Sequence, residues 1–418
     1  MNKQTGTVTD SDVVIIGAGI VGICVAAMLA EQGRSVTVID RTGVCEETSS
    51  GNAGALAISD VLPLAHKGMM KNLPKWLADP LGPLTVSPRY LPALAPWLWR
   101  FWRASMADPV PAIAAQAGLM QLAEIEWLAL LDRSGARPML REDGSLELYE
   151  SESEFRASLP GWAVRDRFGI GYRHVEGEEM AALQPGLSRQ FVKGTFVPSW
   201  KSVSDPMLVG KAIWRYAEAK GARLVVGEAI ALSASGDGAL VSMLGQPPVR
   251  GRTLVIAAGA WSHLLAARFG DRIPLDTERG YNTTLPVGAF DVRRHLVFSG
   301  HGFVIAPLET GVRVGGAVEF AGLKNPPNYA RSKAMLEKAR RFLPGLKTEG
   351  GCEWMGYRPS LPDSLPVIGR GGAPNLIYAF GHGHLGLTQA AATGRLVAQL
   401  VEGSTPALDL SPFSPSRF

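Results

Sequence analysis

Short apolar runs and glycine-rich turns alternate near the start of the chain. The segment DVVIIGAGIVGICVAAMLAEQGRSVTVID (12–40) predicts a strand over 13–16, a turn, and a helix to about Gln32 that Gly33 caps. A second strand follows over 36–39. The first run shows no polar alternation, which is typical of a parallel strand buried on both faces. The pattern therefore predicts one βαβ unit of ~30 residues.

The same periodicities predict the rest of the chain in outline. Residues 60–105 are rich in Pro and Trp and show few clear periods. Elsewhere we expect helices over 120–131, 205–221 and 331–342, strands over 144–149, 223–226, 253–258, 295–298 and 312–319, and a strand, glycine-rich turn and helix over 375–400.

The strands that suit one parallel sheet fall within 13–39, 223–226, 253–258 and 375–380, so they are scattered along the chain. This scatter predicts an α/β protein with a discontinuous Rossmann-like domain and a second, α+β domain inserted in two pieces. We expect the first domain to comprise 1–90, 196–272 and 350–418, and the substrate domain to comprise 91–195 and 273–349.

Glycines at fixed spacing favour a dinucleotide site in the first βαβ unit. Gly17, Gly19 and Gly22 form G-x-G-x-x-G between strand and helix, and Asp40 ends the second strand. The helix N-terminus would face a pyrophosphate, and Asp40 would accept hydrogen bonds from a ribose diol. The alternative is a βαβ unit that binds no nucleotide and needs the glycines only for packing.

The fingerprint does not separate FAD from NAD, but two other segments favour FAD. The loop around Ser49, Ser50 and Gly51 has small side chains that would let a bulky ring approach the backbone. The GHGHLG turn (381–386) enters a helix whose dipole would stabilise negative charge on a reduced flavin. The alternative for this turn is a simple helix start. A nicotinamide dehydrogenase is disfavoured, because only one fingerprint is present.

Composition and charge exclude several other classes of protein. The 418 residues include 42 Lys and Arg against 38 Asp and Glu, so a net charge of +4 gives no argument for nucleic-acid binding. Cys24, Cys45 and Cys352 are an odd set without a Cys/His cluster, so we expect neither a disulfide scaffold nor a metal site, and a reducing compartment. The run 13–30 has no charged residue and is long enough to suggest a membrane-spanning helix or a signal peptide. Its glycines and the acidic residues before it argue against both, so we expect a cytoplasmic protein.

At these motifs the chain resembles the FAD-dependent D-amino acid dehydrogenase family, in the group that contains glycine oxidase, D-amino acid oxidase and monomeric sarcosine oxidase. The resemblance runs nearly end to end. Its most specific stretches are VVIIGAGIVG (13–22), VTVIDR (36–41), ETSSGNAG (47–54), ERGYN (278–282), VRVGGAVEF (312–320), WMGYRPSLPDSLPVIGR (354–370) and YAFGHGHLGLTQAAATGR (378–395).

The resemblance implies non-covalent FAD and an antiparallel sheet over the flavin. It also implies oxidative deamination of a D-amino acid, through an imino acid, to the 2-oxo acid, with electrons passed to a quinone or another acceptor. The expected FAD contacts are Gly17, Gly19, Ile20, Val21, Gly22, Asp40, Arg41, Ser49, Ser50, Asn52, Ala53, Gly54, Val226, Ala258, Gly259, Trp261, Gly383, His384, Leu385, Gly386, Leu387 and Thr388.

Three residues are expected to face the substrate. Arg358, in an Arg-Pro pair, is similar in position to the carboxylate holder of related enzymes, and a guanidinium binds a planar carboxylate in two places. Tyr281 and His301 lie on segments expected to border the substrate. The alternative for Arg358 is a structural or surface salt bridge. Cys352 is out of register with the cysteine that holds the flavin of sarcosine oxidases, so no covalent bond is expected.

Two further features leave alternatives open. His382 and His384 flank Gly383 near the expected flavin, where one of them either tunes the ring or has only a structural role. The segment 89–103 mixes aromatic rings with Arg, which favours either peripheral contact with the inner face of a membrane or packing between domains.

The function therefore has one leading hypothesis and three alternatives. The leading hypothesis is a D-amino acid dehydrogenase. The alternatives are a dehydrogenase of a cyclic D-imino acid such as D-proline or a hydroxy-D-proline, an amine oxidase that uses O2, and a non-catalytic flavoprotein.

Overall fold

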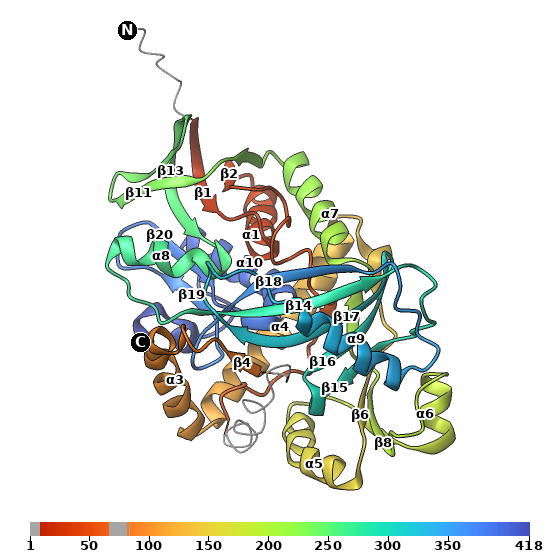
Figure 1. Cartoon of the computed structure of the whole chain (residues 1–418). Coiled ribbons are helices and arrows are strands. Elements are labelled where there is room, and N and C mark those ends of the chain that lie inside the picture. The colour runs from red at the N-terminus through yellow and green to blue at the C-terminus, as the bar shows by residue number, and fades with distance from the viewer. Residues whose placement is uncertain (1–8, 67–81, 83) are drawn as a thin grey trace.

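A computed structural model describes residues 9–66, 82 and 84–418 (Figure 1). Its first sheet has eight strands in the order β10-β2-β1-β13-β12-β11, with β20 bonded to β13 and β19 bonded to β20. Their bounds are β1 Thr9–Ile16, β2 Val36–Asp40, β10 Arg223–Val226, β11 Ala229–Ser235, β12 Gly238–Met243, β13 Gln246–Ile256, β19 Val367–Arg370 and β20 Leu376–Phe380. Because β10, β2, β1, β13 and β20 run parallel, the prediction that these scattered segments share one parallel sheet is confirmed.

Both faces of this sheet are buried. Val13 and Ile15 belong to a core that includes four helices, α1 Ile20–Glu31, α4 Val110–Arg133, α7 Pro206–Ala219 and α10 Gly386–Glu402. Val14 and Ile16 point to the opposite face and pack with residues of the β11–β12 hairpin and of α8 Ser262–Ala266. The apolar run of β1 therefore lacks polar alternation because neither of its faces meets water.

The second sheet has nine strands and lies beside the first (Figure 1). Its order is β18-β14-β17-β16-β15-β6-β8-β7, with β4 paired to β17. The strands are β4 Leu84–Val86, β6 Ser145–Tyr149, β7 Arg173–Val175, β8 Lys193–Val197, β14 Asp276–Leu285, β15 His295–Phe298, β16 Phe303–Leu308, β17 Gly311–Phe320 and β18 Cys352–Ser360. Most pairs are antiparallel, and α9 Ala330–Phe342 packs on β14 and β17.

Shorter elements complete the described part of the chain. A small third sheet joins β3 Ala55–Leu56, β9 Lys201–Val203 and β5 Leu140–Arg141. The remaining α-helices are α3 Leu91–Met106, α5 Glu152–Arg167 and α6 Gly177–Leu183. Short 3-10 helices occupy 137–139, 259–261, 267–269, 299–301, 383–385, 411–413 and 415–417.

The structure differs from the predicted elements mainly in the middle of the chain. A helix, α3, occupies part of the region in which few periods were visible, and α4 begins at Val110 rather than near residue 120. The domain boundaries stay a prediction. The second sheet draws β4 and β18 from ranges that we assigned to the first domain, and β8 crosses the predicted boundary at residue 196. Residues 1–8, 67–81 and 83 of the predicted first domain lie outside the described part of the chain.

Candidate active site

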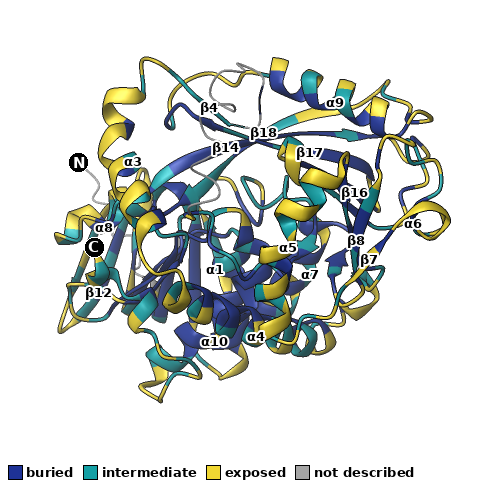
Figure 2. Ribbon diagram, turned by 90° about the horizontal axis from the view of Figure 1, so that it is seen from below, coloured by how far each residue is buried: buried dark blue, intermediate teal, exposed yellow. Residues whose placement is uncertain are grey.

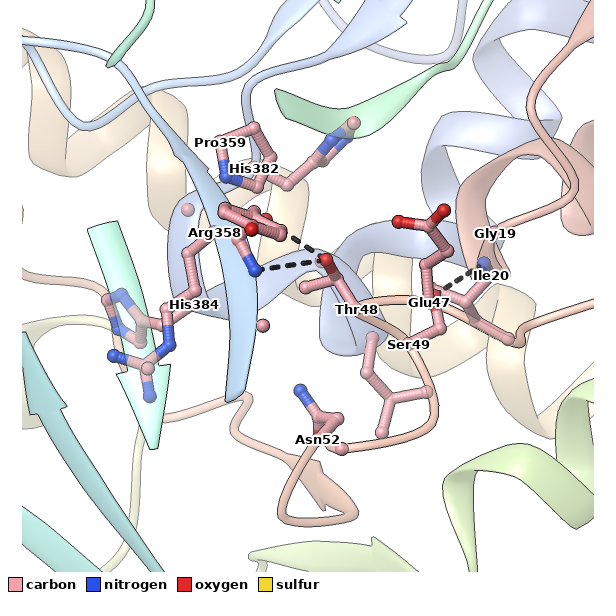
Figure 3. A pocket seen from close by; sticks show the side chains of 18 of the residues that line it. Gly19, Ile20, Glu47, Thr48, Ser49, Asn52, Arg358, Pro359, His382 and His384 are labelled. Carbon is pink, nitrogen blue, oxygen red and sulfur yellow. Dashed lines mark hydrogen bonds between the residues drawn. The ribbon is translucent and has the colours of Figure 1, made fainter. Parts of the chain in front are cut away.

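A cavity of about 680 Å³ lies between the two large sheets. It is bordered by the turn after β1, the loop 47–53, strands β14 and β18, and the turn before α10. In Figure 3, Arg358 and His384 lie toward one side of this space, and Gly19, Ile20 and Ser49 lie toward the other. The volume is in the range of pockets that bind cofactors and small ligands.

The turn after β1 brings the backbone close to the rest of the sheet. Gly17 has φ of +111°, and a Cβ atom there would lie 2.4 Å from the carbonyl oxygen of Ala257. A Cβ atom on Gly22 would lie 1.9 Å from the carbonyl oxygen of Gly17. Both glycines are therefore required by close backbone approach, and the resulting tight turn points the N-terminus of α1 at the cavity.

Asp40 holds this corner together with its side chain. One carboxylate oxygen accepts a hydrogen bond from the backbone N–H of Ala18 at 2.7 Å. The other accepts from the backbone N–H groups of Thr42 and Gly43 and from the Thr42 hydroxyl at 2.9–3.0 Å. The side chain still borders the cavity. Asp40 is thus bound to the protein at both oxygens, and a ribose would use only its remaining acceptor capacity.

An aromatic ring and a cation stand next to Asp40. The guanidinium of Arg41 lies 3.9 Å from the centre of the Trp261 ring and donates two hydrogen bonds to Glu47 at 2.6 and 2.8 Å. The Glu47 carboxylate, through these hydrogen bonds, raises the pKa of Arg41, which therefore keeps its charge. This end of the cavity offers a flat, cationic surface that suits the adenosine and phosphate part of a dinucleotide.

The loop 47–54 is held from three sides. Ser49 Oγ accepts from the backbone N–H of Ile20 at 3.0 Å, which ties the loop to the start of α1. Arg313 on β17 donates to the carbonyl oxygens of Ser50 and Asn52 at 2.9 and 2.5 Å. A Cβ atom on Gly51 would lie 2.3 Å from the indole of Trp354. The small residues of the loop thus allow close contact with β17 and β18.

The glycine-rich turn before α10 closes another side of the cavity. All six of Gly383, His384, Leu385, Gly386, Leu387 and Thr388 border it. His384 Nε2 lies 4.0 Å from Asp60, and the loss of water around its ring lowers the pKa of His384. His382 also borders the cavity, but its Nε2 pairs with Thr393 Oγ1 at 2.9 Å, and burial lowers its pKa to about 3. Both histidines therefore reach the candidate flavin region, and the His382 ring is already held by the protein.

Arg358 lies on β18, directly opposite Glu278 of β14. Its guanidinium passes over Gly280, where a Cβ atom would lie 2.5 Å from Cζ, and Nη1 donates to the carbonyl oxygen of Ala317 at 3.1 Å. Burial lowers the pKa of Arg358 and the Glu278 carboxylate opposes this effect, so the group stays charged. Both Arg358 and Glu278 border the cavity. A fixed cation here is suited to an anionic ligand group.

The structure does not bring Tyr281 and His301 to Arg358. Tyr281 borders the cavity, but strand alternation turns its side chain from the face that carries Gly280, and its hydroxyl donates to Glu319 at 2.5 Å. Burial raises the pKa of Tyr281 to about 12, so this proton stays in place. His301 lies outside the cavity lining, where Nε2 is 2.5 Å from a Glu150 oxygen.

Most of the expected cofactor contacts do meet in this cavity. Those bordering it, besides the six of the turn before α10, are Gly17, Gly19, Ile20, Val21, Asp40, Arg41, Ser49, Asn52, Ala53, Ala258, Gly259 and Trp261. Gly22, Ser50, Gly54 and Val226 are set back from it. Gly227 and Glu228, which follow Val226, border it instead.

Several residues of the cavity wall are not among the contacts expected from the sequence. Glu278, Asn282, His295, Arg313 and Trp354 all border the space. Asn282 is 3% exposed, and its Oδ1 has no hydrogen-bond partner among the described residues, although its amide nitrogen donates to the carbonyl oxygen of Gly51. Such an acceptor without a partner fits a site completed by a ligand. All but His295 lie in stretches that carry the family resemblance, but their place in the wall depends on strand pairing within the second sheet, which no local motif specifies.

The arrangement fits the predicted FAD. The cavity joins a helix N-terminus and a stacked cation at one end to a second glycine-rich helix start at the other, and its lining includes an acceptor that lacks a partner. Cys352 is exposed at the first residue of β18 and does not border the cavity. Within 9–66, 82 and 84–418, no cluster of three His, Cys, Asp or Glu side chains is arranged to hold a metal ion.

Of the helices that the structure describes, none has both the length and the apolar character that a bilayer crossing requires.

Comparisons with known proteins identify the family of this chain. A family model described as FAD dependent oxidoreductase matches residues 12–400. The D-amino-acid oxidase of Bradyrhizobium diazoefficiens is 35% identical, with 97% of this chain and 98% of that protein covered. The D-amino acid dehydrogenase of Rhizorhabdus wittichii is 30% identical, with 97% of this chain and 100% of that protein covered.

Solved structures extend the agreement to the fold. Glycine oxidase from Geobacillus kaustophilus aligns with a TM-score of 0.74 at 23% identity, covering 98% of this chain and 99% of that one. The predicted α/β class, with a second sheet that is largely antiparallel, is confirmed. Since the family model spans nearly the whole chain and the relatives match along their full length, this chain belongs to the family of FAD-dependent oxidoreductases.

Proposed function

We propose that this enzyme oxidises a D-amino acid to its imino acid, which water then converts to the 2-oxo acid, and that the electrons pass to a quinone. The names of the relatives support the substrate class, since those at 35%, 30% and 28% identity are named D-amino-acid oxidase or D-amino acid dehydrogenase. The observation that carries the proposal is the charged guanidinium of Arg358, which borders the cavity and is held over Gly280.

Arg358 has the properties of a carboxylate holder. It carries a permanent charge, one of its nitrogens is already fixed by the carbonyl oxygen of Ala317, and Pro359 restricts the backbone beside it. The remaining N–H groups are available to the substrate carboxylate, which would accept two parallel hydrogen bonds from them. A substrate gripped in this way presents its α-carbon in one orientation, and orientation is the main contribution that the protein makes to this chemistry.

FAD, when bound, supplies the acceptor for the two electrons that leave the α-carbon. Gly19, Ile20 and Ser49 would lie against its phosphates, and the N-terminus of α10 would lie near its ring. Cys352 is exposed and does not border the cavity, which supports a non-covalent cofactor. Acid precipitation should therefore release all of the yellow chromophore into the supernatant, and colour retained in the pellet would contradict this part of the proposal.

The substrate amine must be uncharged when the α-hydrogen leaves, and His384 is suited to this requirement. Its pKa is lowered, so the ring is neutral near pH 7 and adds no positive charge beside Arg358. Glu278 faces the same region, is 5% exposed, and accepts a hydrogen bond from the Ser360 hydroxyl at 2.6 Å. A neutral ring and a buried carboxylate do not repel the ammonium form in which the amine arrives, and this form must lose a proton before the α-hydrogen leaves.

The decisive experiment is an anaerobic screen of flavin reduction over D- and L-amino acids, including cyclic ones. Bleaching by D-amino acids and not by their enantiomers is expected. Arg358→Ala should raise KM by about 10²-fold, which corresponds to about 2.7 kcal/mol at ~1.36 kcal/mol per decade. A screen in which no D-amino acid bleaches the flavin, or an unchanged KM in the variant, would refute the proposal.

A second candidate is an oxidase that passes electrons to O2, and the name of the relative at 35% identity favours it. The relatives at 30% and 28% identity are named dehydrogenases, which favours another acceptor. Turnover in air separates the two. Stoichiometric peroxide would establish the oxidase, whereas fast reduction of a quinone analogue with little peroxide would establish the dehydrogenase.

A further inference from the structure

Helix α3 carries two separate apolar faces, and only one of them is buried. The buried face includes Leu94 and Trp97, which pack with Phe320 of β17 in a small core of their own. The other face carries Leu91, Ala95, Trp99, Trp102 and Met106, all of them exposed. Their spacing of three or four residues places them in one line along the helix.

The buried face fixes the helix firmly to the body of the protein. The Trp97 ring stacks on Phe101 at 5.1 Å and lies 5.0 Å from Phe320. Its indole N–H donates to the carbonyl oxygen of Ser360 at 3.3 Å. Ser360 is the last residue of β18, the strand that carries Arg358. The outer face is therefore a stable surface of a well-packed helix, next to the strand that carries the candidate carboxylate holder.

The outer face is unusually apolar for a surface in contact with water. Leu91, Trp99, Trp102 and Met106 keep 48–50% of their surfaces exposed. From first to last they extend ~22 Å along the helix, at ~1.5 Å per residue. Figure 2 shows α3 at the edge of the molecule, with most of its ribbon in the colour of exposed residues. A continuous exposed apolar stripe of this kind marks a surface that has a partner.

The charges around the stripe indicate which partner this is. Residues 84–110 contain three arginines and a single acidic residue, Asp108. Arg103 lies 5.1 Å over the ring of Trp99, and Arg100 is exposed one helical turn before it. Indole rings flanked by guanidinium groups suit the interfacial layer of a bilayer, where the rings enter the headgroup region and the cations meet lipid phosphates.

We propose that the exposed stripe of α3 binds this protein to the surface of a bilayer that contains anionic lipids, with the helix axis parallel to the surface. Trp99 and Trp102 supply the inserted rings, and Arg100 and Arg103 contact the phosphates. This binding is independent of the substrate, so it can be tested whether or not the proposed oxidation is correct. Its position beside β18 suits an acceptor that is dissolved in lipid.

Co-sedimentation of the FAD-loaded protein with vesicles tests the proposal. The wild type should pellet with vesicles of mixed phosphatidylcholine and phosphatidylglycerol, and less with phosphatidylcholine alone. The double variant Trp99→Glu with Trp102→Glu should lose at least about tenfold in partition, because two rings are replaced by two repelled charges. Replacing Arg100 and Arg103 by Gln should cost about fivefold for each arginine, which is ~1 kcal/mol.

The matched control replaces Leu244 and Val287 by Glu. These residues are 77% and 76% exposed and lie on other hairpins and loops, so partition should be unchanged. Flavin content, together with turnover with a soluble acceptor, should be equal in all variants and shows that each has folded. The proposal is overturned if the wild type stays in the supernatant with anionic vesicles, or if the Trp double variant pellets as well as the wild type.

Light scattering addresses the other possible occupant of the stripe, a second copy of this chain. A wild type that is dimeric and stays in the supernatant with anionic vesicles, and whose Trp double variant is monomeric, would assign the stripe to a protein interface and overturn the membrane proposal.

Discussion

Substituting Gly280 by Ala tests the Arg358 clamp without removing any charge. The added methyl carbon would lie 2.5 Å from Arg358 Cζ and 2.7 Å from its Nε, far inside ordinary contact. The atoms that it meets belong to the end of a flexible side chain, so the guanidinium shifts and the strand does not. Gly280 does not have a positive φ, so alanine is compatible with the backbone of β14 at this position.

The size of the shift follows from that distance. Carbon atoms in contact are ~3.5 Å apart, so the guanidinium must move by about 1 Å. A misplacement of this size costs about 10²-fold in rate where binding geometry sets the orientation of the reacting atoms. We therefore expect kcat/KM for a D-amino acid to fall by one to two orders of magnitude, approaching the effect of Arg358→Ala, while FAD content stays at the wild-type level.

Steady-state kinetics with a soluble acceptor provide the assay. The matched control is Gly171→Ala, because a Cβ atom there meets nothing within 4 Å and the backbone φ is not positive. Its kinetics should equal those of the wild type. If Gly280→Ala keeps its kcat/KM while the protein holds its full complement of FAD, Arg358 does not position the substrate, and the assignment of the clamp is wrong.

Three other predictions concern the cofactor corner and the core. Gly22→Ala forces a methyl group to 1.9 Å from the Gly17 carbonyl oxygen, so the turn after β1 cannot keep its shape. The ratio of flavin to protein absorbance should therefore drop to near zero, and a wild-type ratio would contradict a role of this turn in binding FAD. Asp40→Ala leaves three backbone N–H groups without their acceptor, and each such loss costs ~1–3 kcal/mol for a buried group. We therefore expect the free energy of unfolding to fall by roughly 3 kcal/mol and FAD affinity to fall with it, and an unchanged urea midpoint would refute this. Burial lowers the pKa of His295 to about 4 and of His382 to about 3, both below the ordinary value of 6.5, so stability is complete above pH 6.5 and is lost as the pH falls through this window. At ~1.36 kcal/mol per pH unit for each ring at most, the two rings together should contribute a slope of about 2.4 kcal/mol per pH unit between pH 6 and 4.5. The slope is measurable as a fall in urea midpoint, and a flat profile would contradict the burial of the two rings as neutral groups.

Local patterns were sufficient to predict the first βαβ unit. The run before Gly17, the glycine spacing and Asp40 all lie within ~30 residues, and each depends on neighbours close in sequence. The turn before α10 is likewise a local feature, and six consecutive residues of it border the cavity. Gly33 also adopts the left-handed conformation expected of a C-cap, with φ of +78°.

The substrate side could not be predicted in the same way, because strand pairing decides it. Whether Tyr281 faces the cavity depends on the alternation of β14 between β17 and β18, and on an irregularity in the β14–β17 register between Arg279 and Tyr281. The ring of His301 pairs with the carboxylate of Glu150, which lies 151 residues earlier in the chain. A single sequence shows neither the register of strand pairing nor a partner so far along the chain. The sequence can therefore place Tyr281 in a strand, but it does not show which face of the sheet the side chain lies on.

The loop 47–54 shows why composition alone does not explain small residues at a candidate cofactor contact. Its small residues are required by partners far along the chain: the Trp354 indole lies against Gly51, and Arg313 donates to two of the loop's carbonyl oxygens. A larger side chain at Gly51 would push the loop from β18, and loss of Arg313 would leave those oxygens without their donor. The loop is therefore a joint between the two sheets as well as a candidate cofactor contact. Its small residues are therefore required by both roles at once, whereas Arg313 and Trp354 lie in separate stretches of the chain that only the fold brings to the loop.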